Sequence, residues 1–474
     1  MTATPSSGEG ARVFPQGFVW GAATASYQIE GATGEDGRGM SVWDTFCRTP
    51  GKVRGGDTGD VACDAYHRYR EDVALMARLS LGAYRFSISW PRVQPGGSGP
   101  VNQKGLDYYR ALVDELVEHG IAPTATLFHW DLPQELQDAG GWASRDTAAR
   151  FAEYAGIVGE ALGDQVARVI TLNEPQVVAH LGHRTGEHAP GLTDDAAARA
   201  ATHHLLLGHG LATAALRAVL PAGTPVGITL DLHGVRVAGD RRGLEEAIAI
   251  TEAQTDGLFF EPVVNGRYPA AAPAAVLPLA PLVRDGDLET ISAPIDFLGV
   301  NYYAPIYLRH GDPTDLRADE VPARCGLPGV VEYRPPHLER TPMGWLVDAD
   351  AFHGLLTELA ERAPGLPLFI TENGCAAEDY INPDGAVDDR ERVRYLHAHL
   401  DACARAIADG VPLAGYFVWS LLDNFEWAYG YQKRFGIVFV DFSTQQRTPK
   451  RSAEFYAGVA RANRVPPLAE LVAR

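Results

Sequence analysis

Eight short apolar runs recur along the chain, and segments with helical spacing separate them. The expected strands are residues 18–22, 83–90, 123–128, 169–172, 226–230, 297–300, 368–371 and 414–419. The expected helices are 64–79, 105–119, 147–162, 196–220, 244–258, 349–362, 390–409 and 452–463. This alternation predicts an α/β fold, a (β/α)8 TIM barrel with elaborated βα loops. The competing fold is an open doubly wound sheet, but no Gly-rich dinucleotide fingerprint follows a strand.

The domain organisation follows from the same pattern. The chain has 474 residues, which is long for one domain, but barrels grow by inserting loops into one unit. We find no internal repeat or dividing linker, so we expect a single catalytic barrel over 13–474. Residues 1–12 are rich in small and polar residues and predict a disordered tail. Residues 305–342 are predicted to form a long, irregular inserted loop rather than a domain.

Composition excludes several classes of function. The net charge of −19 argues against nucleic acid or an anionic membrane as partner. We find no apolar run of about 18 residues, so no membrane span is expected. The five cysteines are scattered without CxxC spacing, which predicts neither a disulfide framework nor a zinc site. Residues 1–10 show no signal-peptide pattern, so a cytoplasmic location is expected. We expect no metal or organic cofactor. The sequence does not indicate the oligomeric state.

Two of the expected strands end in a glutamate beside an asparagine. Asn173 and Glu174 follow the fourth strand, and Glu372 and Asn373 follow the seventh. Since a barrel gathers the carboxyl ends of its strands on one rim, the two acids are expected to face one another. One such glutamate alone would more often be a surface acid. A pair of carboxyl groups suits glycoside hydrolysis. If the two carboxyls lie about 5–5.5 Å apart, the configuration at the anomeric carbon is retained, and if they lie about 6.5–9.5 Å apart, it is inverted.

Other strand ends carry the groups that sugar binding needs. Carboxylates and amides hydrogen-bond hydroxyls, and the C–H face of a pyranose packs on an indole. The second strand carries Arg85 and the eighth ends in Trp419. The residues that follow the first, third, sixth and eighth strands include Gln28, His129, Trp130, Asn301, Tyr303, Glu426 and Trp427. Taken singly, each also fits a structural role. Together they predict a carbohydrate site on the rim.

Motifs along nearly the whole chain resemble glycoside hydrolase family 1, the β-glucosidase family. The matching segments are residues 14–31, 41–46, 84–92, 129–133, 171–175, 301–303, 370–374, 419–427 and 434–436. Any one of them is a weak signal, but their occurrence in this order is a strong one.

The resemblance implies a role for each matching position. Glu372 would be the nucleophile and Glu174 the general acid and then base, while Arg85 and Tyr303 would keep Glu372 ionised and oriented. Glycone hydroxyls would be bound by Gln28, His129, Asn173, Glu426 and Trp427. Trp419 would form the floor under the sugar, with Trp130 and Phe435 nearby, and Asn301 would also belong to the substrate-binding set. Trp345 would flank the aglycone. The resemblance also implies that no cofactor takes part.

The chain departs from the family pattern around the outer pocket. Gln176 stands where an aromatic residue is common, Asp231 where Asn is common, and residues 346–350 replace an acidic, Pro-containing run. These changes affect the expected aglycone more than the reaction. Family members that act on 6-phosphosugars have Ser at the position of Glu426, and myrosinase-like members have Gln at the position of Glu174. The two glutamates therefore argue against both subgroups.

The expected function is retaining hydrolysis of terminal β-D-glucosyl residues from small-molecule β-glucosides. Cellobiose, short oligosaccharides such as those from cellulose degradation, and aryl glucosides are plausible substrates. One alternative is a family member specialised for β-galactosides or β-fucosides, or for transglycosylation. An alternative from another class is a non-catalytic sugar-binding barrel, against which the presence of both Glu174 and Glu372 speaks.

Overall fold

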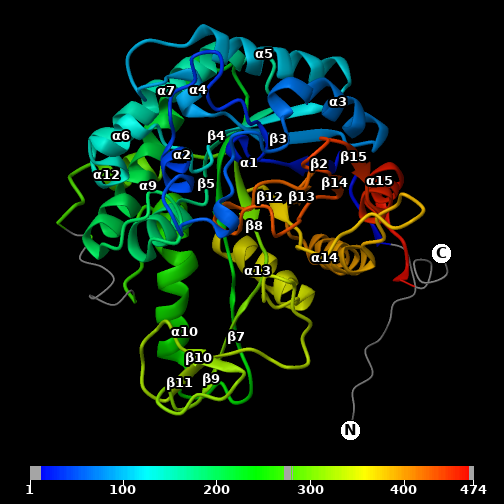
Figure 1. Cartoon of the computed structure of the whole chain (residues 1–474). Coiled ribbons are helices and arrows are strands. Elements are labelled where there is room, and N and C mark those ends of the chain that lie inside the picture. The colour runs from blue at the N-terminus through cyan, green and yellow to red at the C-terminus, as the bar shows by residue number, and fades with distance from the viewer. Residues whose placement is uncertain (1–11, 272–278, 280, 469–474) are drawn as a thin grey trace.

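Eight parallel strands close into a barrel, which confirms the predicted fold (Figure 1). The structure, a computed structural model, describes residues 12–271, 279 and 281–468. The barrel strands are β2 (Val19–Ala23), β3 (Ala83–Ser87), β4 (Ala122–Phe128), β5 (Arg168–Asn173), β6 (Val226–Asp231), β8 (Phe297–Asn301), β12 (Leu368–Asn373) and β13 (Leu413–Trp419). The barrel closes where β13 pairs with β2. Every residue of β12 is buried, as expected for a strand covered on both faces.

Most of the longer helices surround the barrel. The longer helices are α3 (Ala65–Arg78), α5 (Gln103–Glu118), α7 (Asp146–Leu162), α9 (Asp195–Val219), α10 (Glu245–Glu252), α11 (Leu258–Asn265), α13 (Ala349–Arg362), α14 (Arg390–Ala408) and α15 (Arg451–Ala462). The helices around the barrel turn their apolar stripes to its strands, whereas α10 buries Ala247, Ile248 and Ile250 in a second apolar cluster. In α5, for example, Leu106, Leu112 and Leu116 are buried at the predicted spacing.

Short elements elaborate the loops. They are α1 (Ser26–Ile29), α2 (Val42–Cys47), η1 (Arg54–Gly56), α4 (Trp90–Val93), α6 (Gln134–Asp138), η2 (Gly141–Ala143), α8 (Pro175–Val177), η3 (Val178–Thr185), η4 (Ala253–Gly257), α12 (Asp287–Ile291) and η5 (Trp427–Tyr429). Two small antiparallel pairs join β1 (Arg12–Val13) to β16 (Arg464–Val465) and β14 (Val438–Val440) to β15 (Arg447–Pro449).

The segment 305–342 is not irregular throughout, so that prediction was wrong. It contains β9 (Ile306–His310), β10 (Glu320–Pro322) and β11 (Val330–Tyr333), which join β7 (Val235–Val237) in a four-stranded sheet. Figure 1 shows this sheet projecting below the barrel. It has its own apolar cluster, which includes Val235, Leu308 and Val330, and burial of these side chains stabilises strands too short to persist alone.

Three predicted boundaries also need correction. The strand predicted over 83–90 ends at Ser87, because α4 begins at Trp90 with Pro91 in its first turn. The helix predicted over 244–258 is interrupted by the π-helical turn η4 and continues as α11. Arg12, assigned to the tail, pairs in β1 with Val465. The rest of the predicted tail lies outside the described residues.

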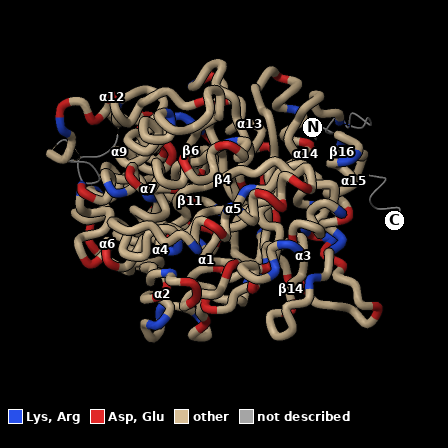
Figure 2. The backbone as a smooth tube through the Cα atoms, turned by 90° about the horizontal axis from the view of Figure 1, so that it is seen from above, with Lys and Arg blue, Asp and Glu red and all other residues tan. Residues whose placement is uncertain are grey.

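Other sequence expectations concern charge, thiols and membranes. Acidic and basic residues are interspersed along the chain in Figure 2. The five cysteines are all buried and free. Within residues 12–271, 279 and 281–468, no helix combines the length and apolar character that a membrane crossing needs. The same residues contain no group of three or more His, Cys, Asp or Glu placed to hold a metal ion.

Candidate active site

A cavity of about 440 Å³ opens at the carboxyl ends of the barrel strands. Ten of the predicted site residues line it: His129, Trp130, Glu174, Tyr303, Trp345, Glu372, Trp419, Glu426, Trp427 and Phe435. The other four, Gln28, Arg85, Asn173 and Asn301, are buried and are hydrogen-bonded among or beside the lining residues. The structure therefore brings the whole predicted set together.

Glu372 is held at the end of β12 by two donors. Arg85 Nη1 donates to Oε1 at 2.6 Å, and the Tyr303 hydroxyl donates to Oε2 at 2.7 Å. Burial raises the pKa of Glu372, whereas the Arg85 charge and the Tyr303 hydrogen bond lower it. Both donors stabilise the ionised form of the carboxyl. These contacts therefore favour the charged state of Glu372.

Glu174 has the opposite surroundings. Asn301 Nδ2 donates to its Oε1 at 2.5 Å, and no cation within 4.0 Å of its carboxyl is found among the described residues. Burial, followed by the negative charges of Glu372 and Asp231, holds the pKa of Glu174 well above its usual range. Burial and the neighbouring anions thus favour the protonated form of Glu174, whereas Arg85 and Tyr303 favour the ionised form of Glu372.

The Asn173 amide connects the donors of the two carboxyls to His129 in the cavity lining. Its Oδ1 accepts from Arg85 Nη2 at 2.6 Å and from Asn301 Nδ2 at 3.1 Å. Two donors on the oxygen fix the orientation of the amide, so Nδ2 donates to Nε2 of His129 at 3.1 Å. The hydrogen of the neutral His129 ring then lies on Nδ1. Burial and the nearby Arg85 hold the pKa of His129 well below its usual range.

Among the predicted site residues, three buried polar atoms have no hydrogen-bond partner within the part of the chain that the structure describes. They are Oε1 of Gln28, Nδ1 of His129 and Oε2 of Glu426. An unpaired buried polar atom costs about 1–3 kcal/mol, so such a set points to a polar ligand. Burial and the Glu372 charge raise the pKa of Glu426 to about 8.

Aromatic side chains form the walls of the cavity. The His129 ring stacks with Trp419 and with Trp427 at centroid distances of 5.8 and 5.9 Å. At the other side, Trp345 packs against Tyr303 at 5.1 Å and Phe435 at 5.9 Å. The cavity thus offers flat apolar faces beside hydrogen-bonding groups.

The backbone around the cavity is strained at three lining residues. Glu174, Trp130 and Trp427 have φ values of 46°, 79° and 46°, in the left-handed region that residues other than glycine rarely adopt. Such conformations cost about 1–3 kcal/mol each and persist where the surroundings impose them. Here they turn the chain sharply after β4 and β5, so that the side chains of Trp130 and Glu174 face the cavity.

Sequence reasoning missed a charged group beside Glu174. Asp231, noted only as a departure from the family pattern, lies at the end of β6 with its Oδ2 3.6 Å from His233 Nε2. His233 Nδ1 lies 3.5 Å from Asp256 Oδ1. Asp231 and His233 stand close together at the end of an expected strand, which was a usable signal in the sequence. Asp256 is distant from them in sequence, so its place beside His233 gave no such signal. Asn424, which accepts from Gln28 at 2.9 Å, was also missed.

A barrel with a buried acid, a buried anion and stacked aromatic rings at its carboxyl rim is the architecture of a carbohydrate-cleaving enzyme. The sequence profile of glycosyl hydrolase family 1 matches residues 11–465. The chain therefore belongs to glycosyl hydrolase family 1, as its motifs predicted.

Relatives match over nearly their full length. Thermostable beta-glucosidase B of Thermobispora bispora is 51% identical, covering 97% of this chain and 93% of the relative. A bifunctional beta-D-glucosidase/beta-D-fucosidase of Bifidobacterium breve is 45% identical, covering 94% and 97%. The family 1 β-glucosidase of Thermotoga maritima, solved in complex with isofagomine lactam, superposes with a TM-score of 0.87 at 43% identity, covering 96% and 100%.

Proposed function

We propose that this chain removes terminal non-reducing β-D-glucosyl residues from β-glucosides by double displacement, with Glu372 as nucleophile and Glu174 as acid and base. The enzyme class is that of a β-glucosidase of family 1. The observation that carries the two roles is the contrast in electrostatics. Glu372 accepts from Arg85 and Tyr303, whereas Glu174 is buried and has no cation within 4.0 Å among the described residues.

In the first step, the Glu372 carboxylate attacks the anomeric carbon and forms a glycosyl ester. Glu174 gives its proton to the departing glycosidic oxygen, so the aglycone leaves as a neutral alcohol or phenol. The ester removes the negative charge of Glu372, which was one cause of the raised pKa of Glu174. That pKa then falls and Glu174 becomes a carboxylate.

In the second step, ionised Glu174 takes a proton from water as the water attacks the anomeric carbon. The bond to Glu372 breaks, and β-glucose and the original protonation states result. Two inversions at one carbon give net retention. Arg85 and Tyr303 stabilise the carboxylate that departs in this step.

The glycone would be held by the buried polar atoms that lack partners. Gln28, His129 and Glu426 supply two acceptors and a donor for hydroxyls, and Trp419 and Trp427 supply flat faces. The relative from Bifidobacterium breve carries a name that includes β-D-fucosidase. Activity on β-D-fucosides is therefore a second candidate function, which relative rates on a nitrophenyl glycoside panel would measure.

Proton NMR of the first sugar released from 4-nitrophenyl β-D-glucoside tests the mechanism. We expect β-glucose first; α-glucose first would mean inversion and would contradict Glu372 as nucleophile. Glu372→Ala is expected to remove nearly all turnover on every substrate. Glu174→Ala is expected to spare kcat/KM for nitrophenyl glucoside, which reports the first step and whose leaving group needs no proton, and to reduce kcat/KM for cellobiose by about 10²–10⁴-fold.

Glu378 provides the control for both variants, since it is an exposed acid six residues after Glu372. Glu378→Ala should retain the activity of the unaltered enzyme. If Glu174→Ala reduces both substrates equally, the division of roles between the two carboxyls is wrong.

A further inference from the structure

Three buried polar side chains on neighbouring strands form a hydrogen-bonded chain inside the barrel. They are Thr229 of β6, Thr371 of β12 and Asn301 of β8. The Thr229 hydroxyl donates to Thr371 Oγ1 at 3.2 Å, and the Thr371 hydroxyl donates to Asn301 Oδ1 at 2.8 Å. The double-displacement mechanism as described so far gives neither threonine a role.

Gly299 makes room for this chain of hydroxyls. It lies in β8, the strand that pairs with both β6 and β12, and it is directly opposite Thr229 in register. A Cβ on Gly299 would collide with Thr229 Oγ1 and would lie 2.9 Å from Thr371 Oγ1. A glycine inside a strand commonly marks such a close approach. The missing side chain therefore allows hydroxyls from β6 and β12 to meet across β8.

The orientation of the Asn301 amide is fixed independently by Arg85. A guanidinium has only donors, so the Asn173 atom 2.6 Å from Arg85 Nη2 is the oxygen Oδ1. The same Oδ1 lies 3.1 Å from the Asn301 amide, so the Asn301 atom that faces it must be the donor Nδ2. The other end of this amide is then Oδ1, which can only accept from Thr371.

Asn301 transmits this orientation to Glu174. Burial raises the pKa of Glu174, and the hydrogen bond from Asn301 Nδ2 to Oε1, at 2.5 Å, lowers it. With Thr371 on its oxygen and Glu174 on its nitrogen, the amide is bonded at both ends, and hydrogen bonds in a chain strengthen one another. Without the Thr371 hydroxyl, Oδ1 would be an unpaired buried acceptor, which is costly. We then expect the amide to turn toward another donor and to withdraw Nδ2 from Glu174.

We propose that Thr371 is a positioning residue for the acid and base of the reaction, because its hydroxyl orients the Asn301 amide toward Glu174. Thr229 and Gly299 support it. The inference rests on the proposed function, in which Glu174 gives a proton in the first step and takes one in the second. In the second step Glu174 is a carboxylate, and the Asn301 donor stabilises that form. Thr371 therefore favours the attack of water on the glycosyl ester.

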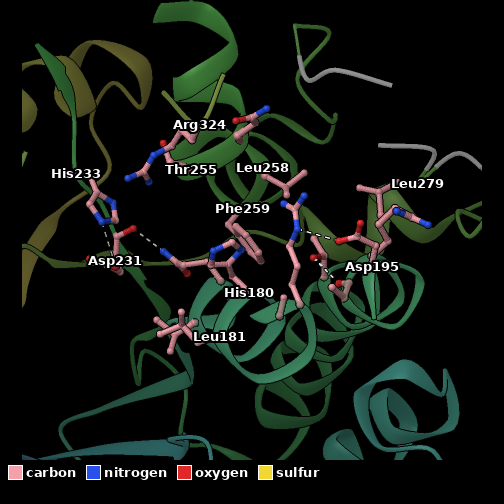
Figure 3. Close-up of a pocket in the computed structure, with 18 of the residues that line it drawn as sticks. His180, Leu181, Asp195, Asp231, His233, Thr255, Leu258, Phe259, Leu279 and Arg324 are labelled. Atoms are coloured by element: carbon pink, nitrogen blue, oxygen red, sulfur yellow. Dashed lines mark hydrogen bonds and ion pairs between the residues drawn. The ribbon is translucent and has the colours of Figure 1, made fainter. Parts of the chain in front are cut away.

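The charged and titratable groups that face Glu174 come from four parts of the barrel. They are Glu372 of β12, Tyr303 after β8, Asp231 of β6 and Arg85 of β3. Figure 3 shows Asp231 together with His233, whose Nε2 lies 3.6 Å from Asp231 Oδ2. A change in the side chain of Thr371 removes none of these groups. It also keeps the Thr371 backbone oxygen, which accepts from Arg85 Nη1 at 3.1 Å.

Replacement of the Thr371 hydroxyl by a methyl group tests the proposal. In Thr371→Val, we expect the basic limb of the kcat/KM profile on cellobiose to move to higher pH by about 0.5–1 unit. The reason is that the pKa of Glu174 rises when the Asn301 hydrogen bond that lowers it is weakened. Burial raises the pKa of Glu372, and Asn301 is one of the smaller causes that lower it, so the acidic limb should move the same way.

Thr371→Ser is the rescue variant, because serine keeps the hydroxyl and loses only a methyl group. Its two limbs should stay in place. Thr371→Ala removes the same hydroxyl without adding an atom, and it should move the limbs to higher pH if Thr371→Val does not fold. Thr213→Val is the matched control, since Thr213 is buried in α9 and donates to the His209 carbonyl oxygen at 2.9 Å within that helix. It should leave both limbs in place.

Limbs that do not move in Thr371→Val and Thr371→Ala would overturn the proposal. An equal shift in Thr371→Ser or Thr213→Val would also overturn it, because the cause would then be packing. The titration of the Glu174 carboxyl, followed by carbon NMR of glutamate-labelled free enzyme, should show the same shift without turnover. If the unaltered enzyme does not hydrolyse β-glucosides, the proposed function is contradicted, while this titration still decides the role of Thr371.

Discussion

The Tyr303 hydroxyl donates to Oε2 of Glu372 at 2.7 Å, while the other carboxylate oxygen accepts from Arg85. Tyr303→Phe removes that donor, and a hydrogen bond to a charged group is worth about 1.5–3 kcal/mol. We expect kcat to fall about 10–100-fold. Because the hydrogen bond lowers the pKa of Glu372, the acidic limb of the kcat/KM profile should move to higher pH.

Tyr302 is the matched control for that prediction. It is buried beside Tyr303 but donates to the Asp348 carbonyl oxygen at 2.9 Å, away from the two carboxyls. Tyr302→Phe should leave both limbs of the pH profile in place. A shift of equal size in both variants would mean that the effect comes from packing rather than from the hydrogen bond.

Asp231→Asn should move the basic limb of the pH profile. The negative charge of Asp231 is one cause of the raised pKa of Glu174, so its removal lowers that pKa. Since Glu174 must be protonated in the first step, we expect the basic limb of kcat/KM to move to lower pH. The measurement is a pH profile on a substrate with a poor leaving group. Asp195→Asn, which removes a carboxylate at the start of α9 that is paired with Arg184, should not move it.

Glu426→Gln should stabilise the protein at neutral and alkaline pH while it weakens sugar binding. The pKa of Glu426 is raised from 4.5 to about 8 by burial and by Glu372. Between these values the unfolded chain has released a proton that the folded chain keeps, so the unaltered protein loses stability as the pH rises. A glutamine side chain at this position has no such proton to lose.

We therefore expect the stabilising effect of Glu426→Gln to grow between pH 4.5 and 8, to about 2–4 kcal/mol. Chemical denaturation at pH 4.5 and pH 8 would measure it. Glu378→Gln removes an exposed carboxylate and should give the same small change at both values. A gain from Glu426→Gln that does not vary with pH would contradict the prediction.

Gly374→Ala should destabilise the rim of the barrel. A Cβ at this position would collide with the backbone carbonyl oxygen of Trp419, which a side-chain rotation cannot relieve. We expect a loss of about 1–3 kcal/mol in unfolding free energy, and reduced activity because Glu372 and Trp419 lie on either side of the contact. Gly458, in α15, has open space at the corresponding point, and Gly458→Ala should stabilise by about 0.5–1 kcal/mol.

The barrel was predictable because its strands are continuous apolar runs. Segments such as Leu368–Asn373 are buried on both faces, which leaves a plain trace in the sequence. The site was predictable for a related reason. Parallel strands deliver their last residues to one rim, so residues as distant in sequence as Arg85 and Glu372 could be placed together before any contact was known.

Features that depend on tertiary contacts were not predictable. The strands β9 and β11 are short. They are stabilised by pairing with one another and by the pairing of β9 with β7 from another part of the chain. Two Gly- and Pro-containing clusters, at 311–313 and 326–329, bound these strands and were usable turn signals. The left-handed backbone of Glu174, Trp130 and Trp427 leaves no compositional trace, because each of these residues normally avoids it.

The pairing of β1 with β16 sets the orientation in which the molecule can be attached to a support. Arg12 leads into the amino end of β2, and Val465 follows α15, which runs back from the carboxyl rim to the same end. Both paired segments therefore lie at the floor of the barrel, opposite the cavity of Glu174 and Glu372. A linker fused before Arg12 or after Val465 would anchor the enzyme by its base and leave the cavity open to dissolved substrate.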